Sequence, residues 1–159
     1  EAVPARQAVV LSGAPLLADL IARLRPGALL MGPDSESAQW VSQAARRHGG
    51  AYAVCAKRRQ GDHAVDIELP DEPVAGRAVV LLDDGASTGH TLAQAAHLLR
   101  AAGAATVDVA VTHALFAGEA VRRLREAGVG EIWSTDCIAH PSNAVFMAEA
   151  LARALDSLA

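Results

Sequence analysis

Short, unbroken runs of apolar residues alternate along this chain with longer amphipathic segments, and this alternation most restricts how the chain can fold. The runs cover residues 28–32, 51–56, 78–82, 107–112 and 131–134. Short apolar runs without polar alternation indicate strands that are buried on both faces, as in a parallel sheet. The sequence therefore predicts an α/β fold with a mainly parallel sheet.

The segments between these runs have the apolar spacing and the stop signals of helices that flank such a sheet. We predict helices over residues 15–24, 35–48, 91–102, 118–127 and 143–158. Because strands and helices alternate to the end of the chain, residues 1–159 are expected to form one domain.

Residues 51–69 interrupt the alternation. The segment from Lys57 to His63 is polar, and Ala64 to Leu69 has the pattern of a returning strand. A flexible, charged hairpin is therefore expected in this region, beside the sheet.

Composition and charge exclude several classes of function. The formal net charge is −4 and the basic residues form no long run, which argues against a DNA- or RNA-binding protein. No apolar run approaches the roughly 18 residues that would span a membrane. Neither Cys55 nor Cys137 has metal-ligand spacing around it, so a reducing, cytoplasmic location is expected.

The most informative motif is Asp-Asp-Gly-Ala-Ser-Thr-Gly-His-Thr at residues 83–91, directly after the strongest apolar run. The motif leads into a predicted helix, whose free N–H groups and positive dipole end favour an anion. Hydroxyl groups add donors, and glycines allow close approach of the backbone. We expect a phosphate on Ser87, Thr88, Gly89, His90 and Thr91, although an ordinary capped helix after an acidic turn is the structural alternative.

The carboxylates of Asp83 and Asp84 precede this anion site and should not contact the phosphate. Charged acceptors suit vicinal hydroxyl groups or a hydrated divalent cation. A diol a few ångströms from a phosphate describes ribose 5-phosphate, which is the ligand that the motif predicts.

The stretch from Leu81 to Thr91 resembles the ribose-phosphate signature of the type I phosphoribosyltransferases. Enzymes that consume phosphoribosyl pyrophosphate (PRPP) and synthetases that make it share this signature. The resemblance implies that Asp83 and Asp84 bind the ribose hydroxyls and that the following loop holds the 5-phosphate. Two positions depart from the pattern, because Ser87 stands where synthetases usually have Asp, and His90 stands where Gly is usual.

The stretch Lys57-Arg58-Arg59 resembles the Lys-x-Arg of the flexible loop in PRPP synthetases, the ribose-phosphate pyrophosphokinases. The resemblance implies that Lys57 and Arg59 are catalytic and stabilise the charge of the transferring group. A solvated hairpin tip is the structural alternative for these cations.

The turn at Pro33-Asp34 resembles the turn of the same synthetases that helps to hold Mg²⁺, which makes Asp34 the implied metal-binding residue. Here Ser35-Glu36-Ser37 replaces the glycines and basic residues that are usual in the family, and a helix cap is the structural alternative for Asp34. Residues 112–118 and 134–138 also resemble synthetase segments in order and spacing.

The resemblance runs from about Leu11 to the end of the chain and covers the C-terminal half of a synthetase, so the half that binds adenine is not expected here. It implies pyrophosphate transfer from Mg·ATP to ribose 5-phosphate, giving PRPP and AMP, by a homo-oligomer whose activity is in doubt without that other half. Two alternatives stay open, a nucleobase phosphoribosyltransferase that uses PRPP and a non-catalytic regulator of synthetase type.

Overall fold

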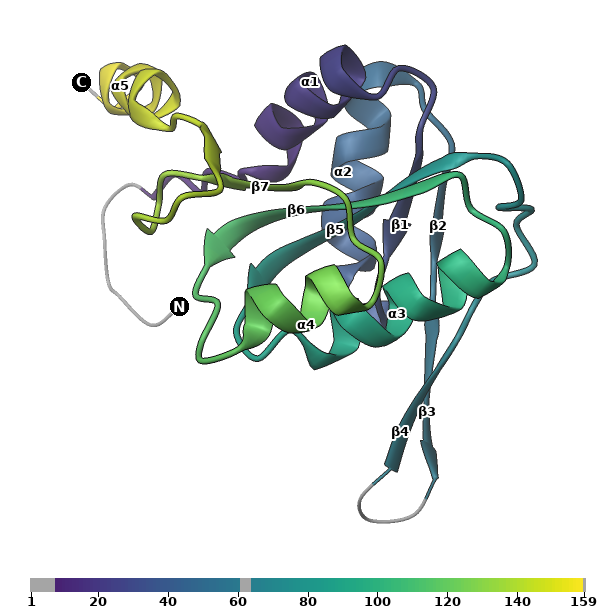
Figure 1. Cartoon of the computed structure of the whole chain (residues 1–159). Helices are drawn as coiled ribbons and strands as arrows, with labels where there is room; N and C mark the ends of the chain where they lie inside the picture. Colours follow the sequence, from purple (N-terminus) through teal and green to yellow (C-terminus); the bar gives the residue numbers. More distant parts are fainter. Residues whose placement is uncertain (1–7, 61–63, 159) are drawn as a thin grey trace.

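The computed structural model describes residues 8–60 and 64–158, which form three layers with a parallel sheet in the middle (Figure 1). The elements are, in chain order, α1 (Ala14–Leu24), β1 (Leu29–Gly32), the 3-10 helix η1 (Ser35–Ser37), α2 (Ala38–His48), β2 (Tyr52–Val54), β3 (Ala56–Gln60), β4 (Ala64–Glu68), β5 (Ala78–Ala86), α3 (His90–Ala101), β6 (Thr106–Ala114), α4 (Ala120–Glu126), β7 (Ile132–Thr135), β8 (Asn143–Val145) and α5 (Ala148–Asp156).

Within the described residues, six strands form the main sheet in the order β2-β1-β5-β6-β7-β8, and every neighbouring pair is parallel. The predicted α/β class with a mainly parallel sheet is therefore confirmed. From β1 the chain moves outward to β2 and then returns to the other side of β1 as β5. Such a reversal of strand order opens a crevice at the carboxyl ends of the two strands, where ligands of α/β proteins bind.

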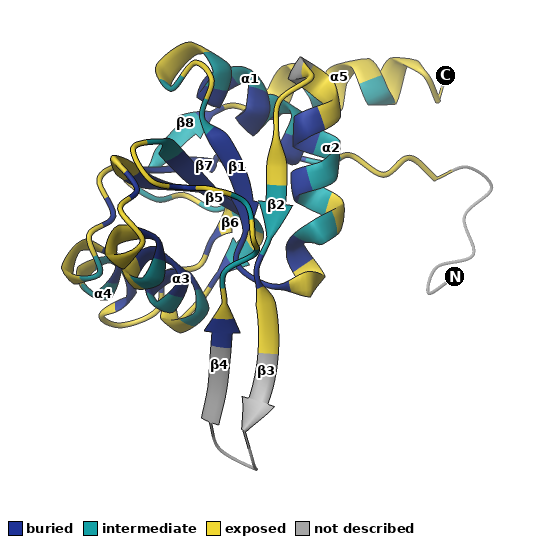
Figure 2. Cartoon of the chain, turned by 90° about the vertical axis from the view of Figure 1, so that its right-hand side faces the viewer, coloured by how far each residue is buried: buried dark blue, intermediate teal, exposed yellow. Residues whose placement is uncertain are grey.

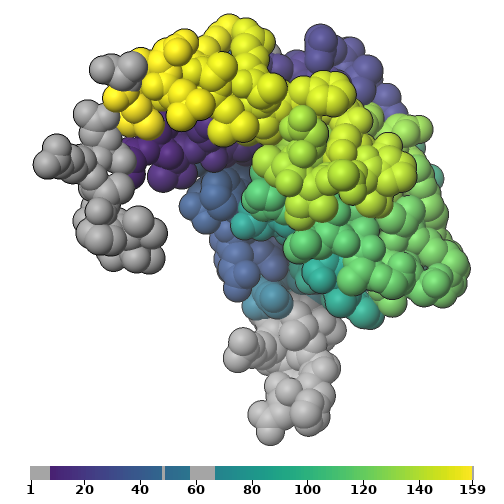
Figure 3. All heavy atoms as spheres, turned by 90° about the vertical axis from the view of Figure 1, so that its left-hand side faces the viewer, coloured from purple at the N-terminus to yellow at the C-terminus, as the bar shows by residue number. Residues whose placement is uncertain are grey.

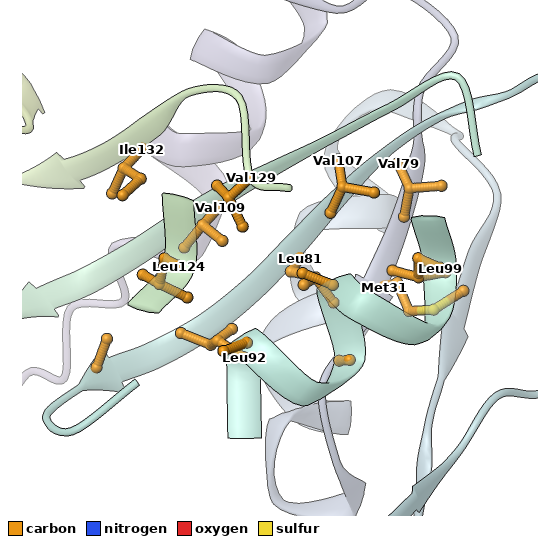
Figure 4. Close-up of a cluster of buried hydrophobic side chains, with 14 of the residues drawn as sticks. Met31, Val79, Leu81, Leu92, Leu99, Val107, Val109, Leu124, Val129 and Ile132 are labelled. Carbon is orange, nitrogen blue, oxygen red and sulfur yellow. The ribbon is translucent and has the colours of Figure 1, made fainter. Parts of the chain in front are cut away.

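Successive side chains of β5 point to opposite faces of the sheet and build two separate cores. Val79 and Leu81 pack with α3 and α4, as Figure 4 shows. Val80 and Leu82 pack with α1 and α2 on the other face. All four side chains are fully buried, which explains why this run is apolar throughout. Figure 2 shows the buried strands between outer faces of helices that are exposed.

The hairpin differs from the prediction in its boundaries. β2 ends at Val54, and the polar residues that follow form a strand of their own, β3, which pairs antiparallel with β4. The hairpin leaves the main sheet and projects from the body of the molecule (Figures 1 and 2). Lys57 therefore lies on a strand near the base of the hairpin and not in a loop.

The prediction of one helix over residues 143–158 is wrong at its start. Asn143–Val145 is the edge strand β8, which pairs parallel with β7. Two hydrogen bonds of 2.9 Å hold its ends: the Ser134 N–H donates to the Ser142 carbonyl, and the Asp136 N–H donates to the Val145 carbonyl. The helix α5 begins only at Ala148.

The helix α5 lies on the surface beside the segment that enters α1 (Figure 3), and no residue of α5 is buried. Across residues 8–60 and 64–158, no helix is both long enough and apolar enough to cross a membrane.

Candidate functional site

The loop after β5 has the geometry of an anion site. β5 runs through Ala86, so the strand extends four residues beyond the predicted end, and α3 begins at His90. Gly89 occupies the N-cap position with a φ of +72°, a conformation that favours glycine. No side chain caps this helix, so the capping alternative is not supported for Ser87 and Thr88. Their side chains are exposed at the free N-terminus of α3.

A cavity of about 210 Å³ lies over this loop. Its lining residues are Asp83, Gly85, Ala86, Ser87, Thr88, Gly89, His90, Thr91 and Leu92. The structure thus brings together the five residues predicted for the phosphate and one of the two acids predicted for the ribose. Asp84 is exposed and does not line the cavity.

Gly85 does not have the backbone role that the sequence suggested. It is the next-to-last residue of β5, its φ is not positive, and a Cβ atom there would meet His113 at an ordinary distance of 3.7 Å. Its missing side chain leaves the cavity wall open. His113, which as a lone histidine would more often be buried, is exposed.

The Asp83 carboxyl is the most perturbed acid of the site. Burial raises its pKa to about 7, and the charges of Asp84 and Asp34 act in the same direction. The N–H of Asp84, which donates to Asp83 Oδ1 at 2.9 Å, opposes this shift. A ligand that donates hydrogen bonds to this carboxylate, or a cation beside it, would relieve the cost of its ionisation.

Asp34 follows β1 and is nearly buried, with 6% of its surface exposed. Its Oδ1 accepts the N–H groups of Glu36 and Ser37, at 3.0 and 3.4 Å, in a capping box at the start of η1. The predicted structural alternative, a helix cap, is therefore confirmed for this oxygen. The other oxygen, Oδ2, faces Lys57 Nζ at 3.6 Å.

The ion pair of Lys57 with Asp34 joins the hairpin to the carboxyl end of β1, a connection that the sequence did not predict. The Lys57 side chain is 32% exposed, so the ammonium group remains accessible from solvent. The side chain of Arg59, the second predicted catalytic cation, lies outside the described residues.

Cys55 lies two residues before Lys57 and is buried. Its N–H donates to the Gly32 carbonyl at 2.9 Å, which places it against the end of β1. Burial and the charge of Asp34 raise the pKa of the thiol to about 11, so Cys55 is a neutral packing residue and not a nucleophile.

A divalent cation fits this site only with ligands from outside the chain. Within the described residues, no group of three or more His, Cys, Asp or Glu side chains could hold a metal ion. Mg²⁺, however, is commonly bound by one or two carboxylates together with substrate phosphates and water. Asp34 Oδ2, which takes no part in the helix cap, and the nearby Asp83 carboxylate suit that kind of binding.

The segment between β6 and α4 supports the phosphate loop. The N–H groups of Phe116 and Ala117 donate to the carbonyls of Ala86 and Ser87, at 2.8 and 3.0 Å. Phe116 has a φ of 28° and its ring lies 4.9 Å from that of His140. From the sequence, this segment was noted only for its resemblance to synthetases, because no local pattern reveals a contact 30 residues away in the chain.

The loop after β7 is tied down by a polar network. Asn143 Nδ2 donates to Ser134 Oγ and to the carbonyls of Thr135 and Ile138, and the Ser142 hydroxyl bonds both Ser134 Oγ and His140 Nδ1. These residues hold the edge strand β8 against β7.

The chain is similar to known proteins in sequence and in fold. A ribose-phosphate pyrophosphokinase from Methanopyrus kandleri is 35% identical over 130 residues, which are 82% of this chain and 45% of that protein. The crystal structure of phosphoribosylpyrophosphate synthetase from Mycobacterium smegmatis matches with a TM-score of 0.73 and 26% identity, over 92% of this chain and 50% of that one. The predicted resemblance to this group is confirmed, and the chain spans about half the length of the curated relatives it matches.

A more distant structure shows the fold alone. Adenine phosphoribosyltransferase from Thermoanaerobacter pseudethanolicus has a TM-score of 0.62 and 20% identity, over 76% of each chain. The family model of the phosphoribosyl transferase domain matches residues 12–148, and the chain therefore belongs to the phosphoribosyl transferase family.

Proposed function

We propose that this chain provides the ribose 5-phosphate site and the cationic hairpin of an enzyme that transfers pyrophosphate from Mg·ATP to ribose 5-phosphate. The observation that carries the proposal is the uncapped N-terminus of α3, which follows the half-buried Asp83 in a cavity of about 210 Å³. Its relatives among the ribose-phosphate pyrophosphokinases support the choice of this reaction over others of the fold.

The sugar phosphate is oriented by two chemically different ends of the cavity. The hydrogen-bond donors from Ser87 to Thr91 and the positive end of α3 suit the 5-phosphate. The carboxylate of Asp83 suits the ribose hydroxyls, because hydroxyl groups donate strong hydrogen bonds to charged acceptors. Asp84 is exposed, and we propose that it contributes from the rim of the cavity.

The polyphosphate of ATP lies, in this proposal, between Asp34 and the hairpin. Lys57, and Arg59 on the same strand, would neutralise charge on the transferring group. Mg²⁺, when bound, would neutralise and orient the phosphate oxygens. Asp34 would hold it through Oδ2, the oxygen that Lys57 faces at 3.6 Å, and Lys57 would then pair with the phosphates instead.

The reaction joins the anomeric oxygen of ribose 5-phosphate to the β-phosphorus of ATP. The bond from that phosphorus to the bridging oxygen of the α-phosphate breaks, AMP leaves, and the hydroxyl proton is lost. The chain contributes by holding the attacking hydroxyl in line with this bond and by excluding water, the roles that dominate phosphoryl transfer.

The direct test is to incubate the chain with Mg·ATP and ribose 5-phosphate and to measure AMP and PRPP. We expect both products in equal amounts, and neither without ribose 5-phosphate. Consumption of PRPP that requires a nucleobase would instead establish a phosphoribosyltransferase. Binding of ribose 5-phosphate without either reaction would support the sugar phosphate site alone, as expected for a non-catalytic regulator or for half of a synthetase.

Two further proposals concern the cellular location and the oligomeric state of the protein. Both cysteines are free thiols, which suits a reducing cytoplasm. A homo-oligomer is proposed from the family resemblance and can be checked by sedimentation velocity.

A further inference from the structure

Three consecutive carbonyl groups of the phosphate loop are bonded from the same side of the loop. Those of Ala86 and Ser87 accept the N–H groups of Phe116 and Ala117. The third, that of Thr88, accepts a hydrogen bond from the guanidinium of Arg123, a residue of α4 that lies 35 positions further along the chain. No comparison or motif assigns a role to Arg123.

The contact follows from how α4 packs on the loop. Gly89 approaches the first residue of α4 so closely that a Cβ atom at Gly89 would lie 3.5 Å from the Cβ of Ala120. Arg123 is three residues later and so lies on the same face of the helix. Its side chain therefore reaches the loop directly.

Holding these carbonyls determines where the N–H groups point. In a planar trans peptide, the C=O and the following N–H point in opposite directions. With the carbonyls of residues 86–88 turned toward the α4 side, the N–H groups of Ser87, Thr88 and Gly89 point away from it. Neither the Thr88 nor the Gly89 N–H group donates to another described residue, so these two groups remain available to an anion.

The charge of Arg123 remains available to the loop because its neighbours pair with each other. Glu119, whose pKa is lowered mainly by Arg122 and slightly by Arg123, bonds to Arg122. Arg122 also pairs with Glu126. The guanidinium of Arg123 thus adds a positive charge behind a loop whose other donors are neutral.

We infer that Arg123 is a positioning residue for the phosphate, which orients the Thr88–Gly89 peptide group and adds charge without being a catalytic residue. This inference rests on the proposed ribose 5-phosphate site. It adds that the phosphate end of that site needs α4, an element in which the sequence showed no functional pattern.

The test compares Arg123→Met with Arg122→Met by titration calorimetry with ribose 5-phosphate. Both changes remove one arginine from the same helix, but Arg122 pairs only with surface acids among the described residues. We expect Arg123→Met to weaken binding about tenfold, or ~1.4 kcal/mol, and Arg122→Met to change it less than about twofold. Arg123→Lys should recover part of the affinity, because one donor and the charge return.

A second readout distinguishes positioning from general stability. In amide NMR spectra, inorganic phosphate should shift the Ser87, Thr88 and Gly89 signals of the wild-type chain, and these shifts should shrink in Arg123→Met while the melting temperature stays near that of Arg122→Met. Unchanged affinity and unchanged shifts in a folded Arg123→Met chain would overturn the inference.

The same spectra separate this inference from the proposed function. If the wild-type chain binds inorganic phosphate at the loop and Arg123→Met does not, the role of Arg123 is supported. This holds even if ribose 5-phosphate binds no more tightly than phosphate, a result that would refute only the assignment of the sugar site. If inorganic phosphate shifts none of the three signals in the wild-type chain, the role of Arg123 is refuted.

Discussion

At the scale of single residues, the half-buried carboxyl of Asp83 links binding to stability. The parallel sheet places it at the end of its central strand, close to two other acids, and raises its pKa from 3.8 to about 7. In the folded chain this group therefore resists the ionisation that the ribose hydroxyls require. A site that binds a diol in this way is expected to reduce the stability of the free protein.

The first prediction is that Asp83→Asn stabilises the chain while weakening its binding of ribose 5-phosphate. The raised pKa means that the wild type loses stability as the pH rises from the usual carboxyl range to about 7, and the asparagine variant does not. Near pH 8 the variant should be more stable by on the order of 2 kcal/mol in urea unfolding, after allowing for partial exposure. At about pH 4 the two should converge.

The same substitution should weaken ribose 5-phosphate binding by about tenfold or more, because a charged acceptor is lost. Asp71→Asn, at an exposed position in the loop before β5, is the control and should alter neither property. Unchanged affinity in Asp83→Asn would refute the assignment of Asp83 to the diol.

The second prediction concerns Lys57. Lys57→Ala should lower the rate of AMP formation by at least about 100-fold, because a cation that acts on the transition state is lost. Its affinity for ribose 5-phosphate should hardly change, because Lys57 does not line the phosphate cavity. Arg46→Ala, at an exposed position of α2, is the matched control. Equal losses of rate and of affinity for ribose 5-phosphate in Lys57→Ala would contradict the role of Lys57 in the transition state.

At the scale of elements, the turn from β5 into α3 depends on a glycine. The third prediction compares Gly89→Ala with Gly76→Ala, since both glycines have a φ of +72°. Each change should cost about 1–2 kcal/mol of stability, because an L-residue is strained in this conformation. Only Gly89→Ala should also lose affinity for ribose 5-phosphate, because Gly89 is the N-cap of α3 and lines the phosphate cavity, so strain there displaces the loop that binds the anion. Equal affinities in the two variants would show that the loop tolerates the change.

The elements that the sequence predicted well are those specified by local pattern. The buried strand β1 and the first five residues of β5 are apolar throughout, and α3 has a clear apolar stripe. The edge strand β8 was missed because its three residues become a strand only by pairing with β7. In the same way β3, which is polar, is a strand because β4 lies beside it. Long-range pairing of this kind leaves no periodic signal in the sequence.

At the scale of the whole molecule, ligand binding and stabilising contacts lie in different parts of the sheet. Asp108, near the start of β6, is 1% exposed, accepts the Glu131 N–H at 2.7 Å and pairs with Arg25 at 2.6 Å. Arg25, which follows α1, also lies over the ring of Trp133. The side chains of Arg25, Asp108 and Trp133 thus join the end of α1 to the sheet, away from the phosphate loop.

The fourth prediction is that Arg25→Met destabilises the chain by roughly 2–3 kcal/mol, because a buried carboxylate loses its counter-ion and part of that interaction is screened by solvent. Arg23→Met, at an exposed position of α1, should cost little. Urea unfolding measures both, and calorimetry should show unchanged ribose 5-phosphate binding. A loss of stability no greater than that of Arg23→Met would mean that the ion pair of Arg25 with Asp108 contributes little to the stability of the fold.

The candidate site was predictable where it is contiguous in sequence and not where distant segments meet. Residues 83–91 form one motif, and their cavity was expected. The pairing of Lys57 with Asp34 and the contact of Arg123 with Thr88 depend on how the hairpin and α4 pack, which the local sequence does not encode.

The measurement that tests the central claim most directly is titration calorimetry of the chain with ribose 5-phosphate, with ribose as the comparison, each in the presence of Mg²⁺. We predict saturable binding of ribose 5-phosphate at one site per chain. Ribose should bind much more weakly, because it lacks the phosphate group that the loop contacts. No heat of binding for ribose 5-phosphate from a folded sample would contradict the claim that residues 83–91 form a ribose 5-phosphate site.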